Sequence, residues 1–333
     1  YLLAGAFAIG RWWSRKGLKS LVVKRILPKK AFLDQVIQVK LELENASLLP
    51  LVWLRLHDSL PVGLTVPNFF SQVLSLGPYE NVKLEYSIRP RRRGFYSIGP
   101  LSLFTGDILG MSHPVKREEL IQNLTVYPKI IPLSNLELPS RFPMGSIRSN
   151  VPIFADPTRT IGKRDYMVGD SLRHVDWKAS AAIGRLQVKK FEPSISIETA
   201  IFLDLHAEVY YQKTRIQTTE LAVVVAASIA NWVVSKRQSA GLFTNGVDPL
   251  VSEGIPNKIP PANGRGHLIR ILETLGRIEM SDSAYIYELI QQESPNLPWG
   301  TTLILITGRI EDQELDVLFE ARRRGQNAVI VLC

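Results

Sequence analysis

The sequence predicts two folded domains of different class: an antiparallel β-sandwich, followed by a doubly wound, mainly parallel α/β domain. The chain has 333 residues, which exceeds one ordinary domain. Hydrophobic residues make up 45% of it, enough to form two buried cores. The domains differ in pattern: apolar and polar residues alternate in the first, whereas unbroken apolar runs alternate with helical segments in the second.

Residues 20–130 are predicted to form the β-sandwich. Apolar residues occupy every second position along 37–44 and again along 82–89, as in strands that bury one face. Prolines and glycines between such segments mark turns, and short strands separated by turns indicate a sandwich. The next region, 131–195, is predicted to be a connector, because residues 131–150 are rich in Pro, Ser, Asn and Gly.

Residues 196–333 are predicted to form the α/β domain. The run Ala200–Leu205 is apolar throughout, as expected of a strand buried on both faces. Strands that alternate with helices predict a parallel sheet with helices on both faces. Further strands are expected at 241–244, 302–307 and 328–332, and helices at 218–236, 266–277, 285–292 and 312–324. The chain stops on the last of these strands, which leaves a C-terminal truncation open.

The N-terminal residues 1–19 are predicted to be the end of a transmembrane helix with a basic juxtamembrane segment. Residues 1–10 are apolar and uncharged, and eight Lys or Arg residues follow before the first acid, Asp34. Ten residues are too few to span a bilayer, but the chain begins with Tyr1 rather than Met. Basic residues after an apolar helix favour a cell-membrane protein with its domains on the cytoplasmic side. The alternative is a buried N-terminal helix.

The charge distribution and the absence of known motifs disfavour several classes of function. The formal net charge is +9, but the basic clusters 89–93 and 322–324 belong to no recognised nucleic-acid fold, so no nucleic-acid partner is expected. The single cysteine, Cys333, excludes an internal disulfide and a cysteine zinc site. No nucleophile or phosphate-binding motif is present. We therefore expect no catalytic residue and no enzyme activity.

The most distinctive segment, 164–180, packs acids and bases closely around aromatic residues. Arginine can pair with carboxylates in bidentate fashion, and tryptophan can stack on a guanidinium group. Such a segment could tie the connector to a domain through a polar network, or it could form a site. The candidate interaction residues are Arg164, Tyr166, Gly169, Asp170, Arg173, Asp176, Trp177, Lys178 and Ser180.

The string Asp176-Trp177-Lys178-Ala179-Ser180 resembles the signature of the domain-of-unknown-function 58 family. The resemblance covers most of the chain and includes these further strings: Gly169-Asp170, Arg173, Val188–Glu192, Arg92-Arg93-Gly94, Tyr96 and Gly99-Pro100. It implies a bacterial or archaeal membrane protein in which a β-rich region precedes a von Willebrand factor A-like, Rossmann-like domain. It also implies a MoxR-type AAA+ ATPase as partner, because the two are often encoded side by side. The resemblance implies no reaction.

Von Willebrand factor A domains often bind Mg²⁺ through Asp-x-Ser-x-Ser after their first strand, since carboxylate and hydroxyl oxygens suit this ion. Here Asp204 is present, but His206 and Glu208 replace the serines. Thr307 is followed by Gly308 where an aspartate is common. We therefore expect no cofactor and a hydrogen-bonded or solvated cluster. The alternative is a transition ion, which imidazole prefers over Mg²⁺.

Taken together, the residues and the resemblance predict a membrane-anchored interaction or scaffold protein that works with a MoxR-type AAA+ ATPase. The alternative is a metal-dependent hydrolase or other enzyme. It would use either the Asp170 and Asp176 carboxylates or the group formed by Asp204, His206 and Glu208.

Overall fold

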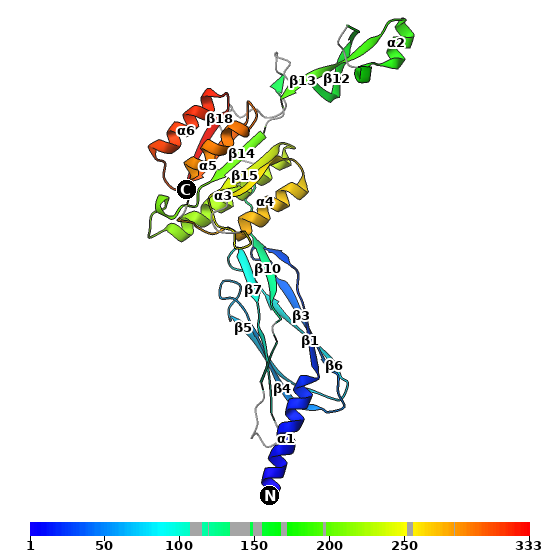
Figure 1. Cartoon of the computed structure of the whole chain (residues 1–333), viewed down its shortest axis with the longest axis vertical. Helices are drawn as coiled ribbons and strands as arrows, with labels where there is room; N and C mark the ends of the chain where they lie inside the picture. Colours follow the sequence, from blue (N-terminus) through cyan, green and yellow to red (C-terminus); the bar gives the residue numbers. More distant parts are fainter. Residues whose placement is uncertain are drawn as a thin grey trace.

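The computed structural model shows an elongated chain (Figure 1). Helix α1 lies at one end, a β-sheet region and an α/β region follow, and a β-hairpin projects at the other end. The structure describes residues 1–106, 115–118, 120–133, 147–148, 155–167, 172–195, 198–251, 256–282 and 284–333.

The β-sheet region, residues 21–127, consists of three sheets with strand orders β1-β3-β6, β2-β10-β7 and β5-β4-β8-β9. Every pairing is antiparallel except that of β10 with β2. The strands are β1 (Leu21–Ile26), β2 (Lys30–Phe32), β3 (Ile37–Asn45), β4 (Leu51–Ser59), β5 (Phe69–Leu76), β6 (Asn81–Ile88), β7 (Gly94–Ile98), β8 (Leu101–Thr105), β9 (Val115–Glu118) and β10 (Gln122–Tyr127).

The alternation in the sequence explains the core of this region. Residues at every second position of β3 are buried, while those between them are exposed or half-buried. Val39, Leu41 and Leu43 join inward residues of β4 and β8 in one apolar cluster. The prediction of antiparallel sheets in this part of the chain is therefore confirmed.

Helix α1 (Leu2–Lys19) packs its C-terminal turns on the β-sheet region. Ser14 and Leu18 are buried, and Gly17 lies against Leu51. In the part of the chain that the structure describes, only α3 (Arg215–Ser235) has the length and apolar composition of a membrane span, and half of its apolar window is buried in the α/β core. This is weak evidence for a membrane, so the N-terminal span and its orientation stay predictions.

The projecting hairpin lies within the region expected to be a connector. Strand β13 (Gln187–Ile195) pairs with β12 (Ala155–Asp165) and with the two residues of β11 (Ile147–Arg148). The 3₁₀ turn η1 (Leu172–His174) and helix α2 (Trp177–Ile183) lie at its tip. The sequence did not indicate these strands, because their ladder has register shifts and no long apolar run.

The α/β region, residues 198–332, contains one five-stranded sheet of order β16-β15-β14-β17-β18. Four strands are parallel, and β16 pairs antiparallel with β15 at the edge. This confirms the predicted sheet with interleaved helices, although the edge strand with its two prolines was not predicted. The elements are β14 (Glu198–Leu203), η2 (Ala207–Val209), α3, β15 (Ser239–Thr244), β16 (Asn257–Ala262), α4 (Arg265–Arg277), α5 (Ile286–Glu293), η3 (Ser294–Asn296), β17 (Thr302–Thr307), α6 (Asp312–Arg323) and β18 (Asn327–Leu332).

Helices cover both faces of this sheet. Apolar side chains of α3 and α4 pack on one face, where Ile201 and Leu203 point. Those of α5 and α6 pack on the other, against Phe202 and Leu305. The chain places β15 on one side of β14 and β17 on the other. The direction in which strands are added therefore reverses between β14 and β17, and their carboxyl ends flank this switch point.

Helix α4 joins the two regions. Arg93, which precedes β7, donates from Nη1 to the backbone oxygens of Leu275 and Ile278 at 2.8 Å each. Its Nε lies 3.0 Å from a carboxylate oxygen of Glu220 on α3. The Tyr96 hydroxyl donates to the Arg92 oxygen at 2.9 Å, which fixes the turn that presents Arg93.

Candidate functional site

The carboxyl edge of the parallel sheet is where open α/β folds usually bind ligands. Asp204 directly follows β14 there and is 1% exposed. Its Oδ2 accepts a hydrogen bond from the Thr307 hydroxyl at 2.9 Å. Its Oδ1 accepts from the Asn245 side-chain amide at 2.8 Å and from the His206 backbone amide at 3.0 Å. Both carboxylate oxygens are therefore engaged by the protein.

His206 and Glu208 do not converge on Asp204. The imidazole is buried and stacks on Tyr285 with ring centroids 4.5 Å apart. Its Nδ1 accepts from the Glu208 backbone amide at 3.4 Å, and the Glu208 residue is exposed on η2. Within the described ranges, no group of three His, Cys, Asp or Glu residues is arranged to hold a metal ion.

Burial dominates the electrostatics of this edge. It raises the pKa of the Asp204 carboxyl, although hydrogen bonds from the His206 amide, Asn245 and Thr307 oppose the shift. Burial also raises the pKa of Glu314, whose carboxylate closes a capping box with Glu311 at the start of α6. The negative charge of Asp204 adds to this second shift. Hydrogen bonds within the protein therefore offset part of the cost of burying the carboxylate at this edge.

Sequence reasoning missed Asn245, which holds the loops at this edge together. Besides binding Asp204, its side chain accepts from the Leu205 amide at 2.7 Å and donates to the Ala284 oxygen at 2.9 Å. The signal available was an amide residue directly after a buried strand, but its partners lie about 40 positions away along the chain.

We expect calorimetric titration of the chain with Mg²⁺, Mn²⁺ and Zn²⁺ to show no micromolar binding. The reason is that the Asp204 oxygens already accept three hydrogen bonds and would have to release them to a cation. Micromolar binding that disappears in Asp204→Ala but persists in Glu208→Ala would contradict this expectation and establish a metal site with unusual ligands.

An apolar cavity of about 260 Å³ lies between α3 and the strands β17 and β18. Its walls include Val224, Trp232 and Val331, and its one polar side chain is Ser228. The Ser228 hydroxyl donates to the Val224 oxygen at 2.7 Å and accepts from the Ile131 amide at 3.0 Å. The walls therefore offer no group for acid–base or nucleophilic chemistry.

The hairpin tip is a second candidate, and Asp176 organises it. Its Oδ1 accepts from the Ala179 amide at 3.0 Å, which caps the N-terminus of α2. Its Oδ2 lies 3.0 Å from the Lys163 ammonium group. The Ala179 hydrogen bond, followed by Lys163, lowers the pKa of Asp176. Asp176 is thus an ionised cap whose two oxygens are both in use.

Ser180 ties α2 to the following strand. Its hydroxyl donates to the Asp176 backbone oxygen and accepts from the Gln187 amide, each at 2.8 Å. The Gln187 side chain in turn hydrogen-bonds Asp165. Small apolar side chains fill the space beneath: Val175, Ala179 and Val188 are buried. Asp176 and Ser180 therefore fold the tip.

The other predicted residues divide into two groups. Arg164 is exposed and donates to the Asp165 backbone oxygen at 3.2 Å, and Tyr166 is half-buried beside it. Gly169 and Asp170 lie outside the described residues, as does the side chain of Arg173.

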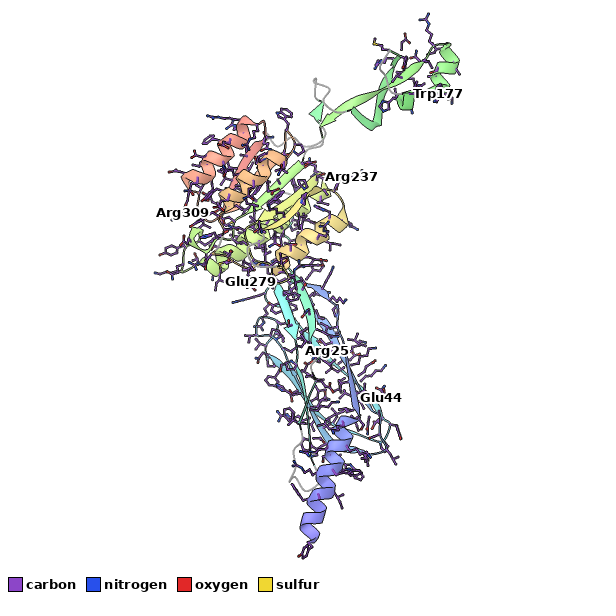
Figure 2. The ribbon with its side chains drawn as sticks, in the orientation of Figure 1. Arg25, Glu44, Trp177, Arg237, Glu279 and Arg309 are labelled. Carbon is purple, nitrogen blue, oxygen red and sulfur yellow. The ribbon has the colours of Figure 1, made fainter. Side chains whose placement is uncertain are left out.

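Trp177 and Lys178 point outward from the tip. Trp177 occupies the first turn of α2 with 65% of its surface exposed, and it is labelled at the far end of the hairpin in Figure 2. Sequence reasoning named Trp177 but missed the apolar residues that accompany it. These are also exposed: Met167 (67%), Leu172 (61%), Ile183 (60%) and Leu186 (42%). The tip therefore exposes several large apolar side chains, which most exposed surfaces carry only singly.

Residues 162–298 match the family described as Protein of unknown function DUF58. The DUF58 match begins in β12 and includes both the hairpin tip and Asp204, whereas Thr307 lies beyond it. The chain is also similar to Uncharacterized protein YeaD of Bacillus subtilis (strain 168). The identity is 24% over 290 residues, which are 85% of this chain and 68% of the relative.

Two solved structures that are similar to the chain each cover 32% of it. The CARDB domain of the PF1109 protein from Pyrococcus furiosus is 13% identical, with a TM-score of 0.24, over 32% of this chain and 91% of that one. A beta-glucosidase from Listeria innocua in complex with gluconolactone is 13% identical, with a TM-score of 0.20, over 32% of this chain and 16% of that one. TM-scores this low add no argument about function, so the DUF58 match is the informative similarity.

Proposed function

We propose that this chain is a membrane-anchored protein-interaction scaffold and that its hairpin tip binds a protein partner, a MoxR-type AAA+ ATPase. The observation that carries the proposal is Trp177, an exposed indole on a helix that Asp176 and Ser180 hold in place. Tryptophan is enriched among the residues that dominate binding energy at interfaces. A rigid helix presents it at low entropic cost. The choice of a MoxR-type ATPase as the partner comes from the family resemblance.

The enzyme alternative has less support. Both oxygens of Asp176 are occupied by Ala179 and Lys163, and both oxygens of Asp204 by neighbouring donors. A general acid or base must reach the proton that it transfers. Neither carboxylate is free to do so, which disfavours an acid–base role for Asp176 and Asp204, whereas Asp170 lies outside the described residues.

We infer that the α/β region has a von Willebrand factor A-like, Rossmann-like arrangement. Its strand order reverses at β14, and an aspartate follows that strand at the carboxyl edge. The Thr307 hydroxyl faces Asp204, where a metal-binding member of this fold would have a ligand. In this chain Asn245 and the His206 amide complete the set of donors, which favours a metal-free scaffold.

The membrane anchor is proposed at α1, with the folded regions in the cytoplasm. The first half of α1 is uncharged, Trp12 and Trp13 are partly exposed, and basic residues follow them. Helix α1 extends from the end of the β-sheet region that faces away from the hairpin (Figure 1). An anchor there leaves the tip free to reach a soluble partner.

Trp177→Ala is expected to weaken binding of a co-expressed MoxR-type ATPase by about 30-fold, corresponding to about 2 kcal/mol for a central interface residue. Because 65% of the Trp177 surface is exposed, its loss should leave the fold intact. Biolayer interferometry with the purified ATPase measures the dissociation constant, and circular dichroism checks folding.

The matched control is Trp299→Ala, since Trp299 is 61% exposed in the α/β region, away from the tip. The dissociation constant of the Trp299→Ala variant for the ATPase should stay within about twofold of the wild-type value. Equal weakening in both variants, or an unchanged constant in Trp177→Ala, would show that the tip is not the binding surface.

A further inference from the structure

We propose that the hairpin tip recognises an acidic segment of its partner, with partner carboxylates on Lys178 and Arg185 and partner apolar side chains on Trp177. This inference rests on the proposed function and adds the chemistry of the bound segment. It follows from the way in which charge is distributed over the tip.

The hairpin is basic by composition. Residues 155–195 contain eight Lys and Arg residues against five Asp and Glu residues. An excess of one sign on a projecting element attracts partners of the opposite sign and speeds their association.

The acids described at the tip are used within the protein, which leaves positive charge on its surface. Asp176 binds Lys163 and the Ala179 amide, and Asp165 accepts from Gln187. Lys178 and Arg185 are exposed and form no ion pair with any residue that the structure describes. These two cations are therefore available to an incoming carboxylate.

The free cations are close in sequence to exposed apolar residues. Lys178 adjoins Trp177 in the first turn of α2, and Arg185 lies between Ile183, the last residue of α2, and Leu186. A surface of this kind fits a segment in which acidic and apolar residues alternate. The guanidinium group of Arg185 can bind a carboxylate through two parallel hydrogen bonds.

Nucleic acid and lipid fit the tip less well. A basic surface for single-stranded nucleic acid uses several aromatic rings on which bases stack, whereas most of the large exposed side chains at the tip other than Trp177 are aliphatic: Leu172, Ile183, Leu186 and Met167. Helix α1, the proposed membrane anchor, lies at the opposite end of the elongated chain (Figure 1). The aliphatic side chains and the position favour a protein.

The test is site-specific crosslinking in cells that produce the full chain. A photoreactive phenylalanine derivative replaces Trp177, and mass spectrometry identifies the adducts after irradiation. We expect peptides that contain Asp or Glu together with apolar residues. Lys178→Glu combined with Arg185→Glu should lower the adduct yield at least fivefold. The matched control, Arg322→Glu with Arg323→Glu on α6, changes the net charge equally and should leave the yield unchanged.

The outcomes separate the two proposals. Peptide adducts without acidic residues, or equal yields from both charge-reversed variants, overturn the acidic-segment inference while the tip remains a protein-binding surface. Adducts with lipid or nucleic acid, or a yield no higher than with the same crosslinker at Trp299, overturn both proposals. Protection of the α2 amides from hydrogen exchange confirms that the charge-reversed tip is folded.

Discussion

Asp58→Ala is expected to lower the free energy of unfolding of the β-sheet region by about 3–5 kcal/mol, the cost of leaving a buried charge without its partner. Asp58 and Arg25 form an ion pair in which both side chains are 0% exposed. Arg25 Nε lies 3.1 Å from Asp58 Oδ2, and the Tyr86 hydroxyl donates to the same oxygen at 2.7 Å. The alanine variant would leave the guanidinium group buried and unneutralised.

The effect is large because Arg25 also connects segments that are distant in sequence. Its Nη1 donates to the Ile98 oxygen at 3.1 Å and to the Leu120 oxygen at 2.7 Å. Burial raises the pKa of the Asp58 carboxyl, and Arg25 with Tyr86 acts against that shift. The network thus offsets a desolvation cost that each member would suffer alone.

Urea denaturation followed by circular dichroism measures this change. Lys40→Ala serves as the exposed control, because Lys40 pairs with Glu85 at 54% exposure of both side chains and should cost under about 1 kcal/mol. Replacing Arg25 and Asp58 together by Met and Leu should recover most of the loss, since no charge then remains buried. A loss below about 1 kcal/mol in Asp58→Ala would show that the pair adds little.

Local periodicity predicted the parts of the fold in which burial follows from neighbouring residues. Alternation along β3 and the apolar run of β14 each correspond to the observed burial. The hairpin was missed because its tip has a core of only a few small residues, Val175, Ala179 and Val188. Such a core leaves no periodic signal, and polar capping by Asp176 and Ser180 compensates for it.

Contacts between segments far apart in the chain could not be predicted from the sequence. The basic cluster 89–93 is visible in the sequence, but the pairing of its Arg93 with Glu220 on α3 is not. The 8% exposure of the Arg93 side chain was not predictable either, because its backbone acceptors on α4 lie more than 180 positions further along the chain. Likewise, Asp204 suggested a ligand site, but the donors that fill it come from other strands.

Arg93→Ala is expected to weaken the junction between the β-sheet region and the α/β region. The free energy of the junction should fall by about 2–3 kcal/mol, the contribution of hydrogen bonds made by a buried charged group. The variant loses the Glu220 pair and leaves the Leu275 and Ile278 oxygens at the end of α4 without their donor. The remaining contacts of the junction are the binding of Glu273 by Lys30 and Tyr127, the burial of Tyr127 in the α/β core and the approach of Gly276 to Val126. Calorimetry should then resolve two unfolding transitions where the wild-type chain shows coupled unfolding.

Loosening should also reach the carboxyl edge of the sheet, because the chain runs directly from Ile278 into it. Glu279 marks the place where the two regions meet in Figure 2. Two residues later, the Ser281 amide donates to the Leu205 oxygen at 3.1 Å, and the Ser281 oxygen accepts from the Ala207 amide at 3.0 Å. These bonds flank Asp204, so hydrogen exchange of the Ser281 and Ala207 amides should accelerate in Arg93→Ala. Arg91→Ala, an exposed neighbour, should leave exchange unchanged, and equal exchange in both variants would show that the junction and the edge are independent.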